Sequence, residues 1–177
     1  MAPLRDLELM IQSHYPLIAI ETFEEARLER ILAEVATSLR VPFFVWSVTT
    51  GLKRYGNLNS IYDSQAPVKA LNNVAAMPGE GLFLFKDLHR YFEKPEVVRK
   101  LQDLAPSFKM DRRVIVLSAA QLGLPAELQA LAGVFTLDLP ALTSSRRSPS
   151  GSSLTSRASG RSAWTSHQRT SPSSSSG

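Results

Sequence analysis

The sequence predicts an α/β fold, a three-layer sandwich in which a five-stranded, mostly parallel sheet lies between two layers of helices. Two observations predict this fold. Short apolar runs alternate over residues 1–143 with longer segments in which apolar side chains recur at helical spacing. Proline and glycine mark most of the joins between these segments. Because strand–helix–strand units form parallel sheets with right-handed crossovers, we expect one α/β domain over residues 1–143.

The first predicted element is a helix over residues 4–13, in which three apolar residues share one helical face. Pro16 disfavours helical backbone in the residue before it, so the helix is expected to end there. Residues 16–20 form a short apolar run. This run is expected to be a strand that is buried on both faces.

The second helix is predicted to begin at a capping box, with Thr22 as the N-cap and Glu25 at the third helical position, and to run to about Leu39. Residues 41–47 are the second expected strand. Their proline stands at the start, where a missing N–H is tolerated. The segment 49–65 holds two glycines and two asparagines, and it is predicted to be a loop.

The middle of the domain is expected to continue with a helix that opens at Pro67, a favourable first helical residue. Residues 82–85 are the clearest buried strand, because all four are apolar and Lys86 and Asp87 follow them directly. A further helix is expected from about Pro95. Pro106 is expected to end or kink that helix, because proline lacks the N–H of the helical hydrogen bond.

The last part of the domain is predicted to contain two strands around a short helix. The fourth strand is expected at 114–118 and the fifth at 134–139. A short helix over 125–131 lies between them. Gly133 is interpreted as the C-terminal cap of that helix.

Composition excludes several classes of protein. The chain has no cysteine, so it has no disulfide framework, no thiol nucleophile and no thiolate zinc site. His14, His89 and His167 lie far apart, without the spacing of metal ligands. No apolar run approaches the roughly 20 residues of a membrane span. The N-terminus has no secretory signal pattern, so we expect a cytoplasmic protein without a membrane partner.

Residues 144–177 are predicted to be a disordered Ser/Arg-rich tail. Serine supplies 15 of these 34 residues, and only Leu154 and Trp164 are large and apolar. The tail carries five arginines and no acid, which leaves 15 basic and 16 acidic residues in the rest of the chain. Two other interpretations stay open. The tail could be an RNA-binding arm, or it could derive from a frameshift, since GC-rich codons yield such residues out of frame.

Several stretches of the domain, taken in order, resemble one known family. They are Tyr15-Pro16-Leu17-Ile18, Glu21-Thr22-Phe23-Glu24-Glu25, Val45-Trp46-Ser47-Val48-Thr49, Leu84-Phe85-Lys86-Asp87-Leu88-His89 and Pro95-Glu96-Val97-Val98-Arg99-Lys100-Leu101. From Leu7 to Leu142 the chain resembles the N-terminal region of the uncharacterised AAA-type ATPases of cyanobacteria and plastids. The resemblance implies a degenerate P-loop-NTPase-like core that precedes the ATPase module. It also implies that this chain is truncated before that module.

The resemblance implies ATP and Mg²⁺ only for the full-length parent, and the chain itself lacks the means to bind them. A P-loop needs the pattern GxxxxGK[ST], and no Gly-Lys pair occurs in the sequence. The first strand-to-helix turn, 21–25, has three carboxylates and no glycine. A phosphate there would meet like charge instead of free N–H donors. We therefore expect neither cofactor nor metal in this chain.

Polar residues near the ends of the predicted strands form a candidate surface site. The candidates are Glu21, Thr22, Trp46, Thr49, Asp87, His89 and Ser118. Asp87 could be a metal-associated acid or a capping residue, and it could form an acid–base pair with His89. Ser47 and Ser118 lack the GxSxG pattern of a nucleophile. Trp46 is interpreted as a core residue.

The leading hypothesis is a non-catalytic N-terminal accessory or docking domain of an AAA-type ATPase, without ATP hydrolysis of its own. Its partners would be the missing ATPase module and an unidentified protein, and the isolated domain is expected to be a monomer. One alternative is a small stand-alone enzyme that uses the strand-end crevice around Asp87 and His89. Another is an RNA-associated protein that acts through its tail. Lys53, Arg54 and Tyr55 form either a solvated loop or a contact for nucleic acid or an acidic partner.

Overall fold

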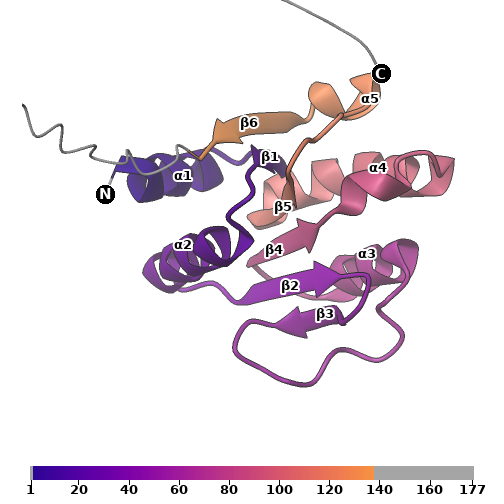
Figure 1. Cartoon of the computed structure of the whole chain (residues 1–177), viewed down its shortest axis with the longest axis horizontal. Helices are drawn as coiled ribbons and strands as arrows, with labels where there is room; N and C mark the ends of the chain where they lie inside the picture. The colour runs from indigo at the N-terminus through magenta and orange to yellow at the C-terminus, as the bar shows by residue number, and fades with distance from the viewer. Residues whose placement is uncertain (1, 138–177) are drawn as a thin grey trace, which may run out of the picture. The chain divides into compact units, whose positions relative to one another are not determined.

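The central element of the fold is a six-stranded mixed sheet (Figure 1). A computed structural model describes residues 2–137. The strands are β1 (Leu17–Glu21), β2 (Phe43–Ser47), β3 (Gly51–Arg54), β4 (Gly81–Lys86), β5 (Arg113–Ala119) and β6 (Ala132–Thr136). Their order in the sheet is β3-β2-β4-β5-β1-β6. All neighbouring pairs are parallel except β2 and β3.

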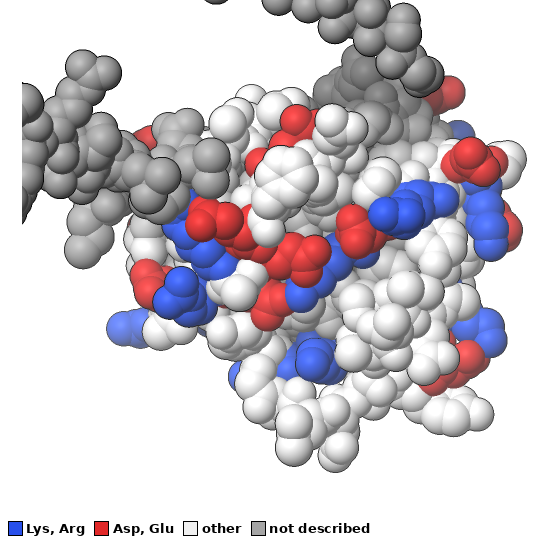
Figure 2. Space-filling model, in the orientation of Figure 1, with Lys and Arg blue, Asp and Glu red and all other residues white. Residues whose placement is uncertain are grey.

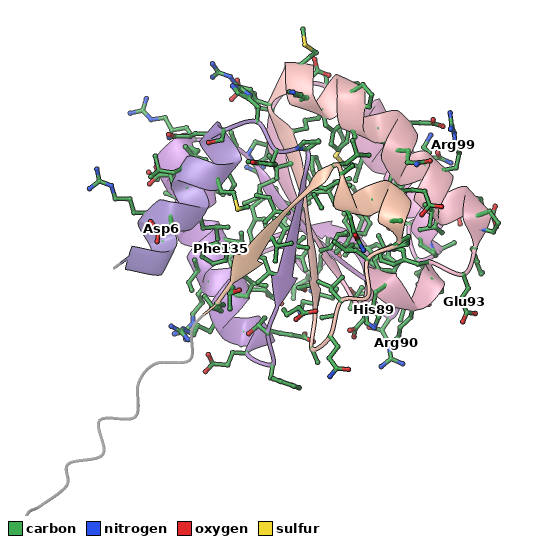
Figure 3. The ribbon with its side chains drawn as sticks, turned by 90° about the horizontal axis from the view of Figure 1, so that it is seen from above. Asp6, His89, Arg90, Glu93, Arg99 and Phe135 are labelled. Atoms are coloured by element: carbon green, nitrogen blue, oxygen red, sulfur yellow. The ribbon has the colours of Figure 1, made fainter. Side chains whose placement is uncertain are left out.

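The helices lie in two layers, one on each face of the sheet. The helical elements are α1 (Ala2–Gln12), α2 (Glu25–Leu39), α3 (Pro67–Ala76), the 3₁₀ helix η1 (Leu88–Tyr91), α4 (Pro95–Asp111) and α5 (Ala126–Gln129). Figure 3 shows α1 and α2 on one side of the strands and α4 and α5 on the other. The fold is therefore the predicted three-layer α/β arrangement. Within residues 2–137, no helix has the length and apolar character to cross a membrane.

Two separate apolar cores hold the layers together, because successive residues of each strand point to opposite faces. Leu82 and Leu84 of β4 belong to the core under α1 and α2, whereas Phe83 and Phe85 belong to the core under α3 and α4. All four side chains are buried. A strand covered on both faces requires a continuous apolar run, which is why β4 is so clear in the sequence.

The predicted number of five strands is wrong, because the segment 49–65 contains β3. This strand pairs antiparallel with β2, and Leu52 stands opposite Trp46. Only one residue of β3 is strongly apolar, so its pattern does not stand out in the sequence. A tertiary contact stabilises it instead, since the Leu52 N–H donates to the Ser64 Oγ at 2.8 Å.

The prediction of a capping box at the start of α2 is also wrong. Glu24 is the N-cap, and no side chain forms a cap hydrogen bond there. The Thr22 N–H donates to the carbonyl oxygen of Ala119 at 2.9 Å, so Thr22 still belongs to the end of the sheet. Its hydroxyl accepts from the Glu24 N–H at 3.0 Å. The helix therefore begins two residues later than the capping pattern predicts.

Pro106 does not end α4, which continues to Asp111. A proline inside a helix removes one hydrogen bond and crowds the preceding turn. Leu104, Ala105 and Phe108 around it are buried against the sheet, and Pro106 itself faces solvent. We infer that tertiary packing of the apolar face outweighs the local cost of the proline.

Gly133 is not a helix cap but a residue of β6, where it stands opposite Ile18. The helix α5 ends at Gln129, with Ala130 as its C-cap. A Cβ atom at position 133 would overlap the Met10 side chain and crowd the Tyr15 ring. This glycine therefore permits a close approach of side chains from outside the sheet. The predicted end of this strand, 138–139, lies outside the described residues.

The chain divides into two units, Met1–Pro140 and Ala141–Gly177. The description above concerns the first unit alone. The predicted tail, 144–177, lies outside the described residues, and with it the hypotheses of an RNA-binding arm and of a frameshift.

Candidate functional site at the carboxyl ends of the strands

The carboxyl ends of β1 and β5 lie side by side, and the chain leaves them toward opposite faces of the sheet. The strand β1 leads into α2 on one face, and β5 leads into α5 on the other. Open α/β sheets bind ligands at such a switch point. A cavity of about 540 Å³ lies there, lined by Phe23, Asp87, His89, Arg90, Ala120, Gln121 and Gly123. Its lining residues come from the segments that follow three different strands, β1, β4 and β5.

Asp87, one of the residues that line this crevice, has an unusual backbone conformation. Its φ of 53° and ψ of 24° are left-handed, which is uncommon for a residue other than glycine. Its N–H donates to the carbonyl oxygen of Ser118 at 2.9 Å, and its own carbonyl oxygen accepts from the Arg90 N–H at 3.2 Å. The chain is thereby turned sharply out of β4 into η1. Asp87 occupies the N-cap position of η1, but its side chain forms no cap hydrogen bond.

Asp87 and His89 are neighbours, as predicted, but they do not form a hydrogen bond. The Asp87 Oδ1 lies 3.9 Å from the His89 Nδ1. This nitrogen is buried and has no hydrogen-bond partner among the described residues. The turn into η1, and not a shared strand face, brings the two side chains together. Figure 3 shows His89 and Arg90 at the same end of the fold.

Glu21 and Thr22 lie at the end of β1, and the contacts of both fasten the backbone around the crevice. The Glu21 Oε1 accepts a hydrogen bond from the Leu122 N–H at 2.7 Å. This bond ties the end of β1 to the loop that follows β5. Thr22 is largely buried and holds the turn into α2 through its hydroxyl. Both residues thus position the two loops that border the switch point.

Lys86, which the sequence did not single out, is the most strongly perturbed charge of the site. Its Nζ forms ion pairs with Glu29 and, at 3.3 Å, with Glu25. Burial by itself lowers the pKa of Lys86, but hydrogen bonds and Coulombic attraction from Glu29 and Glu25 outweigh it and raise the pKa above 10.5. The two glutamates are four residues apart on α2, a spacing that places them on one helical face. The spacing of Glu25 and Glu29 in the sequence could have indicated an acidic face of α2, but it does not show that their partner is Lys86.

The remaining predicted site residues do not reach the crevice. Trp46 is fully buried, and its ring packs against Phe85 and Tyr91. Ser118 is buried within β5. Thr49 lies beyond β2, which β4 and β5 separate from β1. Of the seven candidates, Asp87 and His89 line the crevice, Glu21 and Thr22 fasten the loops that border it, and Trp46, Thr49 and Ser118 lie elsewhere in the fold.

The serine at the end of β2 likewise has a local role. The Ser47 Oγ lies 3.1 Å from the Thr49 Oγ1 and 2.8 Å from the Thr50 Oγ1, so the three hydroxyls brace the turn into β3. Over residues 2–137 no three His, Asp or Glu side chains are grouped so that they could hold a metal ion. The chemistry available in the crevice is thus that of one carboxylate, one imidazole and one guanidinium beside an exposed phenyl ring.

Three longer proteins, each described as an uncharacterized AAA domain-containing protein ycf46, are similar to this chain. The protein of Trieres chinensis is 29% identical over 138 residues, which are 76% of this chain and 28% of the relative. The protein of Pyropia yezoensis is 30% identical over 141 residues, or 78% and 28%. That of Guillardia theta is 29% identical over 143 residues, or 79% and 28%. The chain thus spans less than a third of the length of these curated relatives.

No solved structure matches the chain. A family model described as the N-terminal domain of SpoVK-like AAA ATPases matches residues 4–137, which include every strand of the sheet. The resemblance to the N-terminal region of AAA-type ATPases, stated above from short stretches of sequence, is therefore confirmed. The chain belongs to the family of SpoVK-like AAA ATPase N-terminal domains.

Proposed function

We propose that this chain is a non-catalytic accessory domain of an AAA-type ATPase, which docks a partner protein and binds no nucleotide itself. The observation that carries this proposal is the ion-pair cluster of Lys86, the last residue of β4, with Glu25 and Glu29 of α2, which follow directly after the turn from β1 into α2. In a P-loop core the phosphates of the nucleotide would lie at this turn.

The order of the parallel strands supports a degenerate P-loop-like core. The first strand lies between the last two, and its connecting helix crosses to β2 on the far side of β4 and β5. The turn from β1 into α2 is therefore the position at which a phosphate-binding loop would approach the sheet. In this chain that turn holds Thr22, Phe23 and Glu24, without a glycine.

The residues at this turn do not fit a polyphosphate. Glu25 lies in the first turn of α2 and Glu24 directly precedes it, so their carboxylates complement the positive end of the helix dipole. The Glu24 Oε2 is also bonded to the Arg27 guanidinium at 2.7 Å. Lys86 is the last residue of β4, and its charge is compensated by the carboxylates of Glu25 and Glu29. A nucleotide would have to displace these ion pairs and approach like charge.

Several further parts of the proposal rest on the family. The ATPase module of a full-length member would carry ATP and Mg²⁺, and this domain would bind that module and an unidentified protein. We further propose that the domain acts in the cytoplasm, does not bind membranes or nucleic acid through its folded part, and is monomeric when isolated.

A titration with fluorescent mant-ATP, with and without Mg²⁺, tests the proposal. We expect no saturable signal, and the Glu24→Gln/Glu25→Gln double variant serves as the matched control for like-charge repulsion. Binding by the unaltered chain with a Kd below about 1 mM would overturn the proposal. Binding only by the double variant would identify the carboxylates as the reason for exclusion.

A second candidate function, a small enzyme, is favoured by one observation. Asp87 and His89 lie beside each other in a cavity at the switch point of the sheet. With a slight approach, the Asp87 carboxylate could orient the imidazole of His89 as a general base. Any hydrolytic activity found with this chain should then be lost in both Asp87→Ala and His89→Ala. Activity that persists in both variants would rule this candidate out.

A further inference from the structure

Two large apolar side chains are almost completely exposed in the segment that connects β3 with α3. Leu58 is 97% exposed and Tyr62 is 94% exposed. We call residues 55–66 the β3–α3 loop. Figure 1 places this loop beyond β3, at the edge of the sheet opposite β6. Figure 2 shows a largely uncharged surface in that region, below the band of charged side chains. Exposed apolar surface of this kind indicates an interaction site.

The loop is fastened to the core, so its exposed side chains are not the result of a loose segment. Ser64 is only 1% exposed, and its Oγ donates to the Ile61 carbonyl oxygen at 2.6 Å while accepting from the Leu52 N–H. The Ile61 N–H donates to the Leu52 carbonyl oxygen at 2.7 Å. Lys53 and Ser60 form an antiparallel bridge. Because the loop is already ordered, it would lose little conformational entropy when a partner binds.

The charges beside the loop are positive and uncompensated. Lys53 and Arg54 of β3 form no ion pair within residues 2–137. The acid of the loop, Asp63, is bound to Lys69 at 2.6 Å. Tyr55 packs its ring against Phe43 with centroids 5.1 Å apart and remains partly exposed. Lys53 and Arg54 are successive residues of the edge strand β3, so they project to opposite faces of the sheet on either side of this edge. The edge thus offers cationic groups from both faces next to the loop that carries Leu58 and Tyr62, and Tyr and Arg are enriched among the residues that dominate binding at protein interfaces.

We infer that the β3–α3 loop, with Lys53 and Arg54, docks an acidic and apolar segment of a partner protein. Charge complementarity selects acidic residues in the partner, and Leu58 and Tyr62 select apolar ones. A nucleic acid is a poorer match, because Leu58 offers no polar contact and the first 143 residues carry 16 acidic against 15 basic residues. The inference rests on the proposed docking function and locates its surface.

The test uses the full chain and a fluorescein-labelled peptide in which Asp and Glu are interspersed with Leu and Phe, followed by fluorescence anisotropy. We expect this peptide to bind, and two control peptides, one with Lys replacing the acids and one with Ser replacing Leu and Phe, to bind at least about tenfold more weakly. The Leu58→Ser/Tyr62→Ser double variant should lose about tenfold or more in affinity. The Lys53→Ser/Arg54→Ser variant should show a similar loss and a weaker dependence on salt.

Met110→Ser is the matched control, because Met110 is 83% exposed at the end of α4, far from the loop in sequence. It should leave peptide affinity unchanged. The inference is overturned if the unaltered chain fails to bind the acidic apolar peptide, or if Met110→Ser weakens binding as much as the loop variant. It is also overturned if oligouridine RNA binds in place of the peptide and depends on Leu58 and Tyr62.

Nucleotide binding and peptide binding, measured on the same chain, distinguish a failure of this inference from a failure of the proposed function. Mg²⁺-dependent nucleotide binding together with loop-dependent peptide binding would overturn the proposed lack of nucleotide binding and support the docking surface. Peptide binding that is unchanged in the loop variants would overturn the location of the surface and leave a docking domain in place. All variants replace exposed or half-exposed side chains, and thermal unfolding by circular dichroism checks that each remains folded.

Discussion

The indole N–H of Trp46 donates a 2.8 Å hydrogen bond to the backbone carbonyl oxygen of Ser64. Trp46 lies in the core of the sheet, and Ser64 lies near the end of the β3–α3 loop. The bond therefore attaches a surface loop directly to the core. It also explains why Trp46, a candidate for the functional site, is buried and structural instead.

Replacing the loop anchor should destabilise the fold. Ser64→Ala removes the acceptor of the buried Leu52 N–H and the donor to the partly buried Ile61 carbonyl oxygen, and leaves both groups without that partner. We expect the free energy of unfolding to fall by about 1–3 kcal/mol in urea denaturation. Ser60→Ala, an exposed serine of the same loop, should change it by less than about 0.5 kcal/mol. Equal effects of the two substitutions would contradict the anchoring role.

Two glycines offer a matched test of close packing. A Cβ at Gly133 would overlap the Met10 side chain, whereas a Cβ at Gly123 meets no atom within 4 Å. We expect Gly133→Ala to lower the free energy of unfolding by about 1 kcal/mol, the lower end of the cost of overpacking, because the flexible end of Met10 can move aside while the Tyr15 ring is crowded at 3.3 Å. Gly123→Ala should be within about 0.5 kcal/mol of the unaltered chain. A neutral Gly133→Ala would mean that the end of the Met10 side chain and the Tyr15 ring both move aside without cost.

The ion pairs of Lys86 predict a pH dependence. Burial lowers the pKa of Lys86, but Glu29 and Glu25 raise it overall, so the folded chain holds this proton more tightly than the unfolded chain. Their stabilising contribution is complete below the ordinary pKa of 10.5 and is lost as the pH rises through the folded value. The difference in unfolding free energy between the unaltered chain and Lys86→Met should therefore be constant from about pH 7 to 9 and shrink above about pH 10.5. A difference that grows in alkali would contradict the assignment.

The left-handed backbone of Asp87 can be tested by two substitutions at one position. Glycine adopts this conformation freely, whereas the same conformation costs alanine about 1 kcal/mol. Since the Asp87 side chain forms no cap hydrogen bond, Asp87→Gly should retain or slightly raise the free energy of unfolding, and Asp87→Ala should lower it by about 1 kcal/mol relative to glycine. A loss of more than about 2 kcal/mol in Asp87→Gly would show that the carboxylate stabilises the fold.

Pro106 is expected to cost stability where it stands. It lies inside α4 and faces solvent, so it leaves a helical carbonyl without its N–H donor. Pro106→Ala should raise the free energy of unfolding by about 1 kcal/mol or more, since the restored hydrogen bond outweighs the greater freedom of the unfolded chain. Lys109→Ala, exposed on the same helix, is the control and should be nearly neutral. A lower melting temperature for Pro106→Ala would contradict this account.

Much of the fold could be predicted from local patterns. A strand covered on both faces must be apolar throughout, and Leu82–Phe85 and Val114–Leu117 are recognisable for that reason. Helical spacing likewise identified the long helices, including α2 to its last residue, Leu39. The sheet has six strands instead of the predicted five. The strand β3 has only one strongly apolar residue, Leu52, and a contact with Ser64, twelve residues further along the chain, stabilises it, so no local pattern indicates it.

The candidate site was only partly predictable. The position of Asp87 and His89 at the end of an apolar strand was visible in the sequence, and the two residues do lie in the strand-end crevice. Their lack of a hydrogen bond follows from the turn into η1, which no local pattern indicates. The partners of Lys86 lie on a helix far from it in sequence, so their contact depends on how β4 packs beside α2.

The sequence alone determined which segments are buried, the absence of a phosphate-binding loop and the resemblance to AAA-type ATPases, because each of these depends on residues that are close together in the chain. Tertiary structure decided the rest. The contacts of Trp46 with Ser64, of Lys86 with Glu29 and of Gly133 with Met10 join segments that are distant in the chain. Such contacts form only after the sheet and its helices have packed, so their energies leave no periodic signal in the sequence.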